Sequence, residues 1–342
     1  PKPQNPKVRL NCVVKEIQEV NNFEGFTKKF CELLHSSEHR GVKARLHLHG
    51  HELLQEQFAG VRHVNLIYVL ARVADTAVVF ELFKVAYPKS KHYLRCRARY
   101  KKYLHWLYLE NPLGPPVGIN AYADNMLVGH YVCIPTLWIQ NNKIYSALLS
   151  LNTAVHPNFR RQGIFSILAK KTYQSAKEAN FDFVYGVSNK NSTAGFIKLN
   201  FKVITQLYLQ LSFNFTISKK TSFLSAQKLT RHLTDDMLNW RLNRPFTSYN
   251  EISGRVLSKT QNSPLKILSG QTGKENFGPS VNRVSLFSLF VGAEKQKKMI
   301  ALPSFFRPSA LNLIYKPLSR RSRNLNTESE NWNFDFLDFD LA

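Results

Sequence analysis

The chain has 342 residues, of which 44% are hydrophobic and 12% aromatic, and it carries a formal net charge of +24 at neutral pH. This length predicts two domains, or one domain with a long extension, and the hydrophobic content excludes a wholly disordered chain. The most apolar stretch, Leu66 to Phe83, is interrupted by Arg72, Asp75 and Glu81, so we do not expect it to span a membrane.

The cysteines and the net charge give information on the compartment and the partners of the protein. The four cysteines lie far apart and form no CxxC pair, which fits thiols in a reducing compartment better than a disulfide framework. We see no secretory signal at the start of the sequence, and we expect a cytoplasmic protein. The positive charge belongs either to a lysine-rich soluble surface or to a surface that attracts a polyanion, and net charge alone does not separate the two.

Residues 1–62 are predicted to be a basic extension of unknown role. They begin with a lead rich in proline and lysine, and an amphipathic stretch follows. His47, His49 and His51 would lie on one face of a strand. No cysteine or carboxylate stands nearby at a metal-binding spacing, so we expect no metal site.

Residues 63–215 are predicted to form a mixed α/β domain, because strand and helix periodicities alternate along this segment. The turns between the middle strands carry Asp124-Asn125 and Asn141-Asn142-Lys143. The predicted elements, in chain order, are a strand at 65–72, a helix ending at Pro88, a helix at 103–109, strands at 117–123, 126–135, 137–140 and 144–155, a helix after Gly163, a strand at 183–187, a helix at 193–199 and a strand at 208–213.

The segment 151–165 carries the most specific signal in the chain. An apolar strand pattern ends at Val155, a His-Pro turn follows, and Arg160-Arg161-Gln162-Gly163 begins a helical pattern. The N–H groups of a first helical turn have no intrahelical partner, and a glycine lets an anion approach them. With two guanidinium groups beside it, such a turn can hold a pyrophosphate. An ordinary helix start with two exposed arginines would show the same residues.

Residues 65–212 resemble the GNAT superfamily of acyl-CoA-dependent N-acyltransferases. In that family an R/Q-x-x-G-x-G/A turn between a strand and a helix binds the pyrophosphate of the cofactor. Here Arg160 and Gly163 match, whereas Phe165 stands where the family usually has Gly or Ala. The resemblance implies acetyl-CoA as the donor substrate. The residues that it implies in binding acetyl-CoA are Thr153, Ala154, Val155, Arg160, Arg161, Gln162, Gly163, Ile164, Phe165, Asn189 and Ser192.

The segment from Asn189 to Phe201 resembles the second signature of this family, in which a polar residue after a strand precedes a helix. By this resemblance Asn189 and Ser192 lie along the pantetheine arm. Phe196 stands where many members carry a tyrosine that acts as general acid, and Asn200 replaces a common glycine. The identity of the acid therefore stays open.

The chemistry that the resemblance implies is direct acyl transfer, with the backbone N–H groups of Thr153 to Val155 acting as the oxyanion hole. His156 follows this strand directly and titrates in the range that a catalytic base needs, so it is our candidate catalytic residue. A capping role at the His-Pro turn explains His156 as well.

Residues 216–342 are predicted to be a degenerate second GNAT-like lobe that binds no cofactor. Trp240 stands before Pro245 much as Trp106 stands before Pro112, which is a weak internal repeat. The aromatic segments at 308–315 and 332–340 look like the closing strands of the long GNAT-type proteins of polysaccharide and surface-sugar gene clusters. No Arg-x-x-Gly turn follows a strand in this part of the sequence. The expected fold class is thus a GNAT-type mixed sheet flanked by helices, with a second degenerate α/β lobe.

We therefore expect an N-acetyltransferase that moves an acetyl group from acetyl-CoA to a primary amine. The resemblance suggests an amino sugar as acceptor, and a peptide or a small polyamine also fits. One alternative is a tandem GNAT-like enzyme that takes amino acids from charged tRNA, and another is a non-catalytic polyanion binder that uses Lys89–Lys102 and Arg320–Arg323. The intact turn at 160–163 favours coenzyme A (CoA), and the basic runs lack the interleaved aromatic residues that bind single strands. The sequence predicts no oligomeric state.

Overall fold

The computed structural model describes residues 66–71, 76–88, 96–213, 226–252, 255–259, 266–271, 287–296, 299–302 and 310–339. The chain divides into two compact units, Pro1–Val69 and Leu70–Ala342. The extension predicted at 1–62, with its three alternating histidines, lies outside the described residues. Within the described ranges no helix is long and apolar enough to cross a membrane, and no group of His, Cys, Asp or Glu could hold a metal ion.

The helices and strands mostly follow the sequence prediction. One difference is that 126–140 is a single strand running through Pro135. The missing N–H of Pro135 leaves no gap in the sheet. Along one edge of this strand, pairing with the strand Val117–Ala123 ends at Cys133, and pairing with the strand Leu229–Arg231 begins only at Trp138. Pro135 lies between these two paired stretches and has no strand partner on this edge. The elements are β1 Leu66–Leu70, α4 Thr76–Ala86, α5 Arg97–Leu109, β2 Val117–Ala123, β3 Met126–Gln140, β4 Lys143–Val155, α6 Ile164–Glu178, β5 Phe183–Asn189, α7 Lys190–Lys198, β6 Lys202–Gln206, β7 Tyr208–Phe213, β8 Leu229–Arg231, α8 Asp235–Leu242, β9 Tyr249–Ile252, β10 Arg255–Lys259, β11 Lys266–Gln271, β12 Phe287–Gly292, β13 Ile300–Ala301, β14 Leu311–Pro317, α9 Arg320–Arg323 and β15 Trp332–Asn333.

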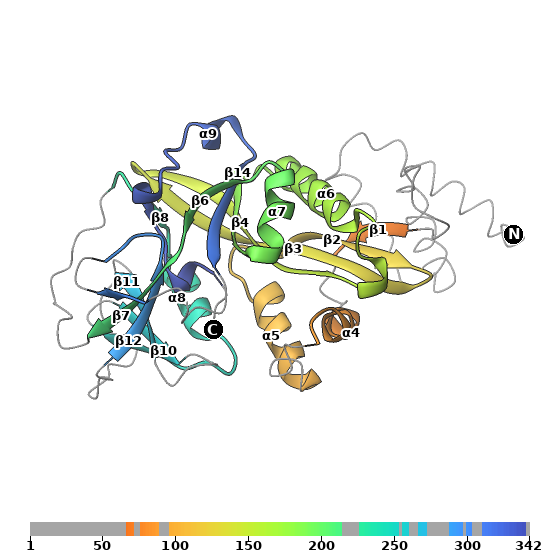
Figure 1. Cartoon of the computed structure of the whole chain (residues 1–342), viewed down its shortest axis with the longest axis horizontal. Coiled ribbons are helices and arrows are strands. Elements are labelled where there is room, and N and C mark those ends of the chain that lie inside the picture. The colour runs from red at the N-terminus through yellow and green to blue at the C-terminus, as the bar shows by residue number, and fades with distance from the viewer. Residues whose placement is uncertain are drawn as a thin grey trace, which may run out of the picture. The chain divides into compact units, whose positions relative to one another are not determined.

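The first sheet has the strand order β2-β3-β4-β5-β14-β6. Only β4 and β5 run parallel among these neighbours, and every other pair is antiparallel. Helices α6 and α7 lie on one side of the sheet, and α4 and α5 lie on the other (Figure 1). The chain is thus a mixed α/β protein with a large sheet flanked by helices, as the sequence predicts.

The second sheet repeats this pattern. Its strand order is β9-β10-β11-β12-β7-β13, and β11 and β12 form its one parallel pair. The two sheets exchange a strand: β7 follows β6 in the sequence but pairs with β12, whereas β14 comes from near the C-terminus and pairs with β5 and β6. A second lobe of the same fold would have this topology. The domain boundaries at 62/63 and 215/216 stay predictions.

The internal repeat in the sequence marks a reciprocal contact between α5 and α8. The indole N–H of Trp106 donates to the carbonyl of Trp240 at 2.9 Å, and the indole N–H of Trp240 donates to the carbonyl of Trp106 at 3.0 Å. The two rings stack with centroids 4.8 Å apart. Both indole N–H groups are therefore satisfied in a buried contact.

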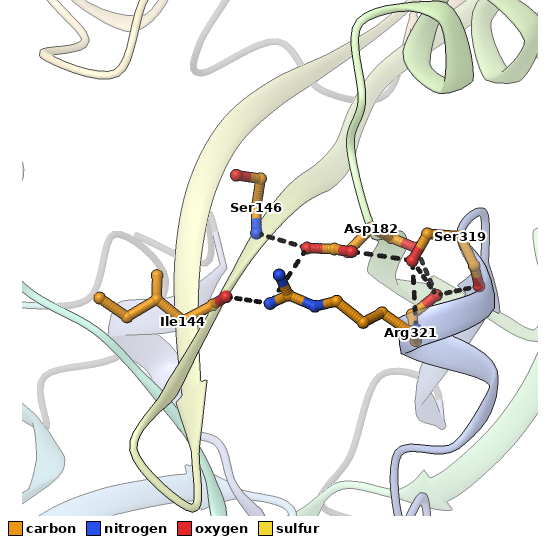
Figure 2. Close-up of polar contacts among 6 residues, drawn as sticks. Ile144, Ser146, Asp182, Ser319 and Arg321 are labelled. Carbon is orange, nitrogen blue, oxygen red and sulfur yellow. Dashed lines mark hydrogen bonds and ion pairs between the residues drawn. The ribbon is translucent and has the colours of Figure 1, made fainter.

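Asp182, just before β5, ties the C-terminal segment to the start of the parallel pair (Figure 2). Its carboxylate accepts from the N–H of Ser146 on β4 at 3.1 Å and from the hydroxyl of Ser319 at 2.8 Å. Arg321 lies 3.8 Å from the same carboxylate and donates to the carbonyl of Ile144. These bonds hold the turn after β14 against β4 and β5.

We expect the Asp182→Ala variant to lose about 1–3 kcal/mol of unfolding free energy, because it leaves the half-buried donors of Ser146 and Ser319 without their acceptor. Arg321→Ala is the matched control. The Arg321 side chain is 56% exposed, so its loss should cost less than about 1 kcal/mol. Urea denaturation gives the unfolding free energy of each variant. Equal losses of unfolding free energy in the two variants would contradict the central role of Asp182 in this network.

Candidate active site

The parallel pair β4–β5 stops pairing before either strand ends. The register runs from Ala147 opposite Phe183 to Ser150 opposite Gly186 and goes no further. Residues 151–155 of β4 and 187–189 of β5 continue as strand without pairing with each other. Backbone groups on the facing edges of these two segments are therefore not used in pairing between β4 and β5.

A bulge lies in β4 just beyond this point. His130 of β3 is opposite Ala154, but Val132 is opposite Leu151, so β4 carries one extra residue between them. Asn152 lies in the bulge with φ +48°, a left-handed conformation that asparagine tolerates better than most residues. The bulge re-aims the backbone of β4 where pairing with β5 has ceased.

Two side chains occupy the carbonyls of β4 at this edge. The hydroxyl of Tyr87, which follows α4, donates to the carbonyl of Thr153. Arg160 donates through Nε to the carbonyl of Val155 at 3.2 Å and through Nη2 to the carbonyl of Ala86 at 2.8 Å. The Arg160 guanidinium thus joins the end of α4 to the end of β4, and its contact with a phosphate stays a prediction.

The N–H of Val155 faces the same edge. The N–H of His156 donates to the carbonyl of Val128 at 2.8 Å, and hydrogen-bonded pairs alternate along an antiparallel ladder. Val155, opposite Gly129, is therefore a non-bonded pair whose N–H points away from β3, toward β5. Within the described sheet this leaves a backbone donor at the place where the resemblance puts the oxyanion hole.

The turn at 160–163 leads from β4 into α6 and contains two residues in the left-handed conformation. Gly163 has φ +76° and no atom within 4 Å of where a Cβ would stand, and Arg161 has φ +64°. Gly163 is the N-cap of the 15-residue helix α6, and no described side chain caps this end. An uncapped N-terminus with open space before it suits an anion, because its N–H groups and the helix dipole both face outward.

Phe165 departs from the family pattern for a packing reason. Its ring lies edge-on to Phe196 of α7 at 5.4 Å and to Tyr131 of β3 at 6.0 Å. A Cβ on Gly195 would meet the ring at 3.0 Å. Phe165 therefore packs α6 against α7, and Phe196, which replaces the family tyrosine, is the buried partner of the same contact.

Asn189 and Ser192 hydrogen-bond with each other. The Asn189 side chain accepts from the N–H groups of Asn191 and Ser192, and the Ser192 hydroxyl accepts from the N–H of Asn189. This is a capping box at the start of α7. The predicted contact of both residues with a pantetheine arm remains a prediction, since their side chains already serve the helix.

His156 has the capping role that the sequence left open. Its Nδ1 accepts from the N–H of Asn158 at 3.3 Å, at the start of the 3₁₀ turn Pro157–Phe159. With Nδ1 accepting, a neutral imidazole carries its proton on Nε2 and has no free lone pair for a second proton. His156 could act as a base only by giving up this long hydrogen bond, so its catalytic role stays a prediction.

Buried phenols lie beside the last β4–β5 pair. The Tyr131 hydroxyl lies 2.8 Å from the Ser150 hydroxyl and 2.8 Å from the Tyr173 hydroxyl. Burial raises the pKa of Tyr131 and of Tyr173 well above the ordinary tyrosine value, and it raises the pKa of the nearby Cys133 thiol to about 12. All three groups stay protonated at neutral pH, so none of them is a nucleophile or a base there.

Sequence reasoning missed the side chains that hold the β4 bulge from the α4 and α5 side of the sheet. They come from five separate segments, which are the residue after α4, then α5, β2, β3 and β4, and only one has a local signal: an asparagine within a strand pattern indicates a left-handed residue. The residues are Tyr87, Tyr108, Asn120, His130 and Asn152.

A cavity also lies at the other end of β4. It has about 600 Å³ of space and is lined in part by Lys143, Ile144, Tyr145 and Arg321. The Arg321 guanidinium stacks on the Tyr145 ring at 4.6 Å. This cavity belongs to the Asp182 network of Figure 2 and not to the turn at Gly163.

Comparison with known proteins finds a family model that matches part of the chain. Residues 70–197 match the family model described as an acetyltransferase (GNAT) domain. A search of the curated proteins finds no match.

Among solved structures, a GCN5-related N-acetyltransferase from Kribbella flavida is similar with a TM-score of 0.51 at 6% identity, over 74% of this chain and 71% of that one. A GCN5-related N-acetyltransferase from Anabaena variabilis has a TM-score of 0.45 at 11% identity, over 75% and 73%. A GNAT family acetyltransferase from Brucella melitensis in complex with acetyl-CoA has a TM-score of 0.33 at 14% identity, over 41% and 84%. The first of these likenesses shows a shared fold and nothing further.

Proposed function

We propose that this chain, which carries a GNAT acetyltransferase domain at residues 70–197, transfers an acetyl group from acetyl-CoA to a primary amine. The single observation that carries the proposal is the end of β4–β5 pairing at Ser150 and Gly186, together with the uncapped N-terminus of α6 at Gly163, which follows β4 in the chain. The unpaired edges suit the extended pantetheine arm, and the helix N-terminus suits the pyrophosphate.

The reaction is the attack of a neutral amine nitrogen on the thioester carbonyl carbon. The new C–N bond forms, the C–S bond breaks, and CoA leaves as a thiolate that takes up the proton lost by the amine. The N–H of Val155 faces the edge where the thioester carbonyl oxygen would lie, and it would stabilise the negative charge that develops there. A thiolate leaves as a weak base, so a group with the tyrosine role is not required at Phe196.

The acceptor is proposed at the level of the resemblance, as an amino sugar. Cytoplasmic action is part of the same proposal, and the described cysteines Cys96 and Cys133, both free thiols, support it. Calorimetric titration with acetyl-CoA and CoA tests the donor, and incubation with a panel of amino sugars, polyamines and peptides, read by mass spectrometry, tests the acceptor. Tight CoA binding would argue against both the tRNA-dependent and the non-catalytic alternatives, whereas absence of CoA binding would overturn the proposal.

The C-terminal segment supports one cofactor site per chain. In the second sheet the parallel pair β11–β12 ends at Leu268 and Phe290. Beyond that point the Asp335 carboxylate accepts from the N–H of Gly270 at 2.5 Å, and the N–H of Ala293 donates to the carbonyl of Phe334 at 2.9 Å. The chain itself thus occupies the backbone groups that correspond to those left unpaired in β4 and β5.

We therefore expect one CoA bound per chain. Calorimetric titration of the wild type should give a stoichiometry of one, and that single site should weaken in the Gly163→Glu variant, since the site at α6 is the open one among the described residues. A stoichiometry of two would contradict a second lobe without a cofactor.

A further inference from the structure

Four polar side chains form a hydrogen-bonded row beneath the bulge of β4. The Asn152 side-chain N–H donates to the Tyr108 hydroxyl at 2.8 Å. The Tyr108 hydroxyl lies 3.2 Å from His130 Nε2, and His130 Nδ1 lies 2.6 Å from the Asn120 side-chain oxygen. The row runs from β2 through β3 and α5 and ends at Asn152, in the part of β4 that does not pair with β5.

The chemistry of the row fixes its direction. An amide oxygen only accepts, so His130 Nδ1 must carry the proton that it shares with Asn120. Nε2 of the neutral ring then accepts, and the Tyr108 hydroxyl donates to it. The Tyr108 hydroxyl oxygen in turn accepts the hydrogen bond from the Asn152 side-chain N–H through a lone pair. Every hydrogen bond in the row therefore has one possible orientation.

His130 is held in this neutral form. Its side chain is 1% exposed, and burial lowers its pKa to about 3. The ring neither gains nor loses a proton between pH 5 and 9, so the row does not serve as an acid or a base. Its effect is geometric, because a buried row with a single orientation resists displacement of any member.

The member that reaches the site is Asn152, the left-handed residue of the bulge. Its backbone sets the path of β4 into Thr153 and Val155, whose carbonyls are held by Tyr87 and Arg160. The bulge is thus held through the side chain of Asn152, and the strand that follows it is held through the carbonyls of Thr153 and Val155. The N–H of Val155 is aimed by this combination of contacts.

We propose that Tyr108, His130 and Asn120 are positioning residues that hold Asn152, and through the β4 bulge aim the N–H of Val155 at the thioester carbonyl. This role rests on the proposed acetyl transfer. It assigns a function to a polar row that would otherwise be a costly feature of an apolar core.

The test is the polarisation of the bound thioester. We expect wild-type protein to shift the carbonyl stretch of [1-13C]acetyl-CoA to lower frequency on binding, as a hydrogen bond to that oxygen requires. In Tyr108→Phe the stretch should return toward its value in free acetyl-CoA, and transfer to the best amine of the panel should slow about tenfold. The Kd of acetyl-CoA should change less than about threefold, because phosphate contacts dominate binding.

Two further variants separate positioning from general loss of stability. Asn152→Gly keeps the left-handed backbone but removes the amide, and the double variant with Tyr108→Phe should be no worse than either single one. Tyr315→Phe is the matched control: it removes a buried tyrosine hydroxyl of β14 that donates to the backbone carbonyl of Ser322 on α9 at 2.6 Å. It should lower stability and leave the carbonyl stretch unchanged.

The outcomes distinguish the two proposals. Two results would overturn the positioning role alone. In the first, Tyr108→Phe binds acetyl-CoA and the carbonyl stretch of the bound thioester stays at its wild-type frequency. In the second, the losses of transfer rate in the two single variants add up in the double variant. A wild-type protein that does not bind acetyl-CoA would overturn the proposed function and this role with it.

Discussion

Replacing Gly163 with Glu is expected to weaken CoA binding by about a hundredfold or more. The new side chain would point into the open space before α6 and place a negative charge against the pyrophosphate. Lost charge-assisted hydrogen bonds and added repulsion together cost about 3 kcal/mol, which corresponds to a hundredfold change in Kd. Calorimetric titration of the purified variant measures the effect.

Gly114→Glu is the matched control for that experiment. Gly114 has φ +106°, and nothing lies within 4 Å of where its Cβ would stand. The control therefore brings a similar backbone strain and the same change of charge at a turn far along the chain from α6. Unchanged affinity in Gly163→Glu, or an equal loss in Gly114→Glu, would remove the α6 turn from the cofactor site.

The second large effect is expected from Asp338→Asn, in the C-terminal segment. Burial, and next the neighbouring Asp335 carboxylate, raise the pKa of Asp338 to about 8, against the opposing effect of Arg231 and Arg241. The folded protein therefore keeps a proton on Asp338 that the unfolded chain releases near pH 4. Since the folded state binds more protons over this interval, its stability falls as the pH rises from about 4 to about 8.

An asparagine at 338 keeps the shape and an oxygen that can accept the 2.9 Å bond from the N–H of Asp335, but it does not ionise. The variant should match the wild type near pH 4 and exceed its unfolding free energy at pH 8 by a few kcal/mol, at about 1.4 kcal/mol per unit of pKa shift. Urea denaturation of both proteins from pH 4 to 9 gives the difference curve. Parallel pH profiles would show that Asp338 is ionised in the folded protein.

The sequence by itself determined the features that depend on neighbouring residues. The turn at 160–163 can be read from Gly163 and the strand before it, because helix starts and left-handed positions are set locally. Hydrophobic alternation placed β2 to β5 within a few residues of their observed bounds, except that Pro135 suggested a break. The departure of Phe196 from the family tyrosine was also visible in the sequence, since residue identity alone decides whether a proton is available.

The tertiary structure alone decided which distant segments meet. The sequence predicted the strand at 208–213 as part of the first domain, but β7 pairs with β12 of the second sheet, and β14 lies between β5 and β6 in the first sheet. Strand pairing depends on contacts far apart in the chain, and side-chain alternation is the same in either sheet. Arg160 shows the same limit: its sequence context suggested a phosphate, and the fold brings the carbonyl of Ala86 within its reach.

The polar row below the bulge is the clearest case. An asparagine within a strand pattern, as at Asn152, is a local signal for a left-handed residue that the sequence analysis did not use. Its partners Tyr108, His130 and Asn120 lie on α5, β3 and β2 and share no pattern in the sequence. In the sequence, a histidine within an apolar strand is equally typical of a core residue whose ring nitrogens are hydrogen-bonded. Only the packing of these elements against one another makes it part of a row that ends at the candidate active site, because hydrogen bonds between distant side chains exist only once the core has formed.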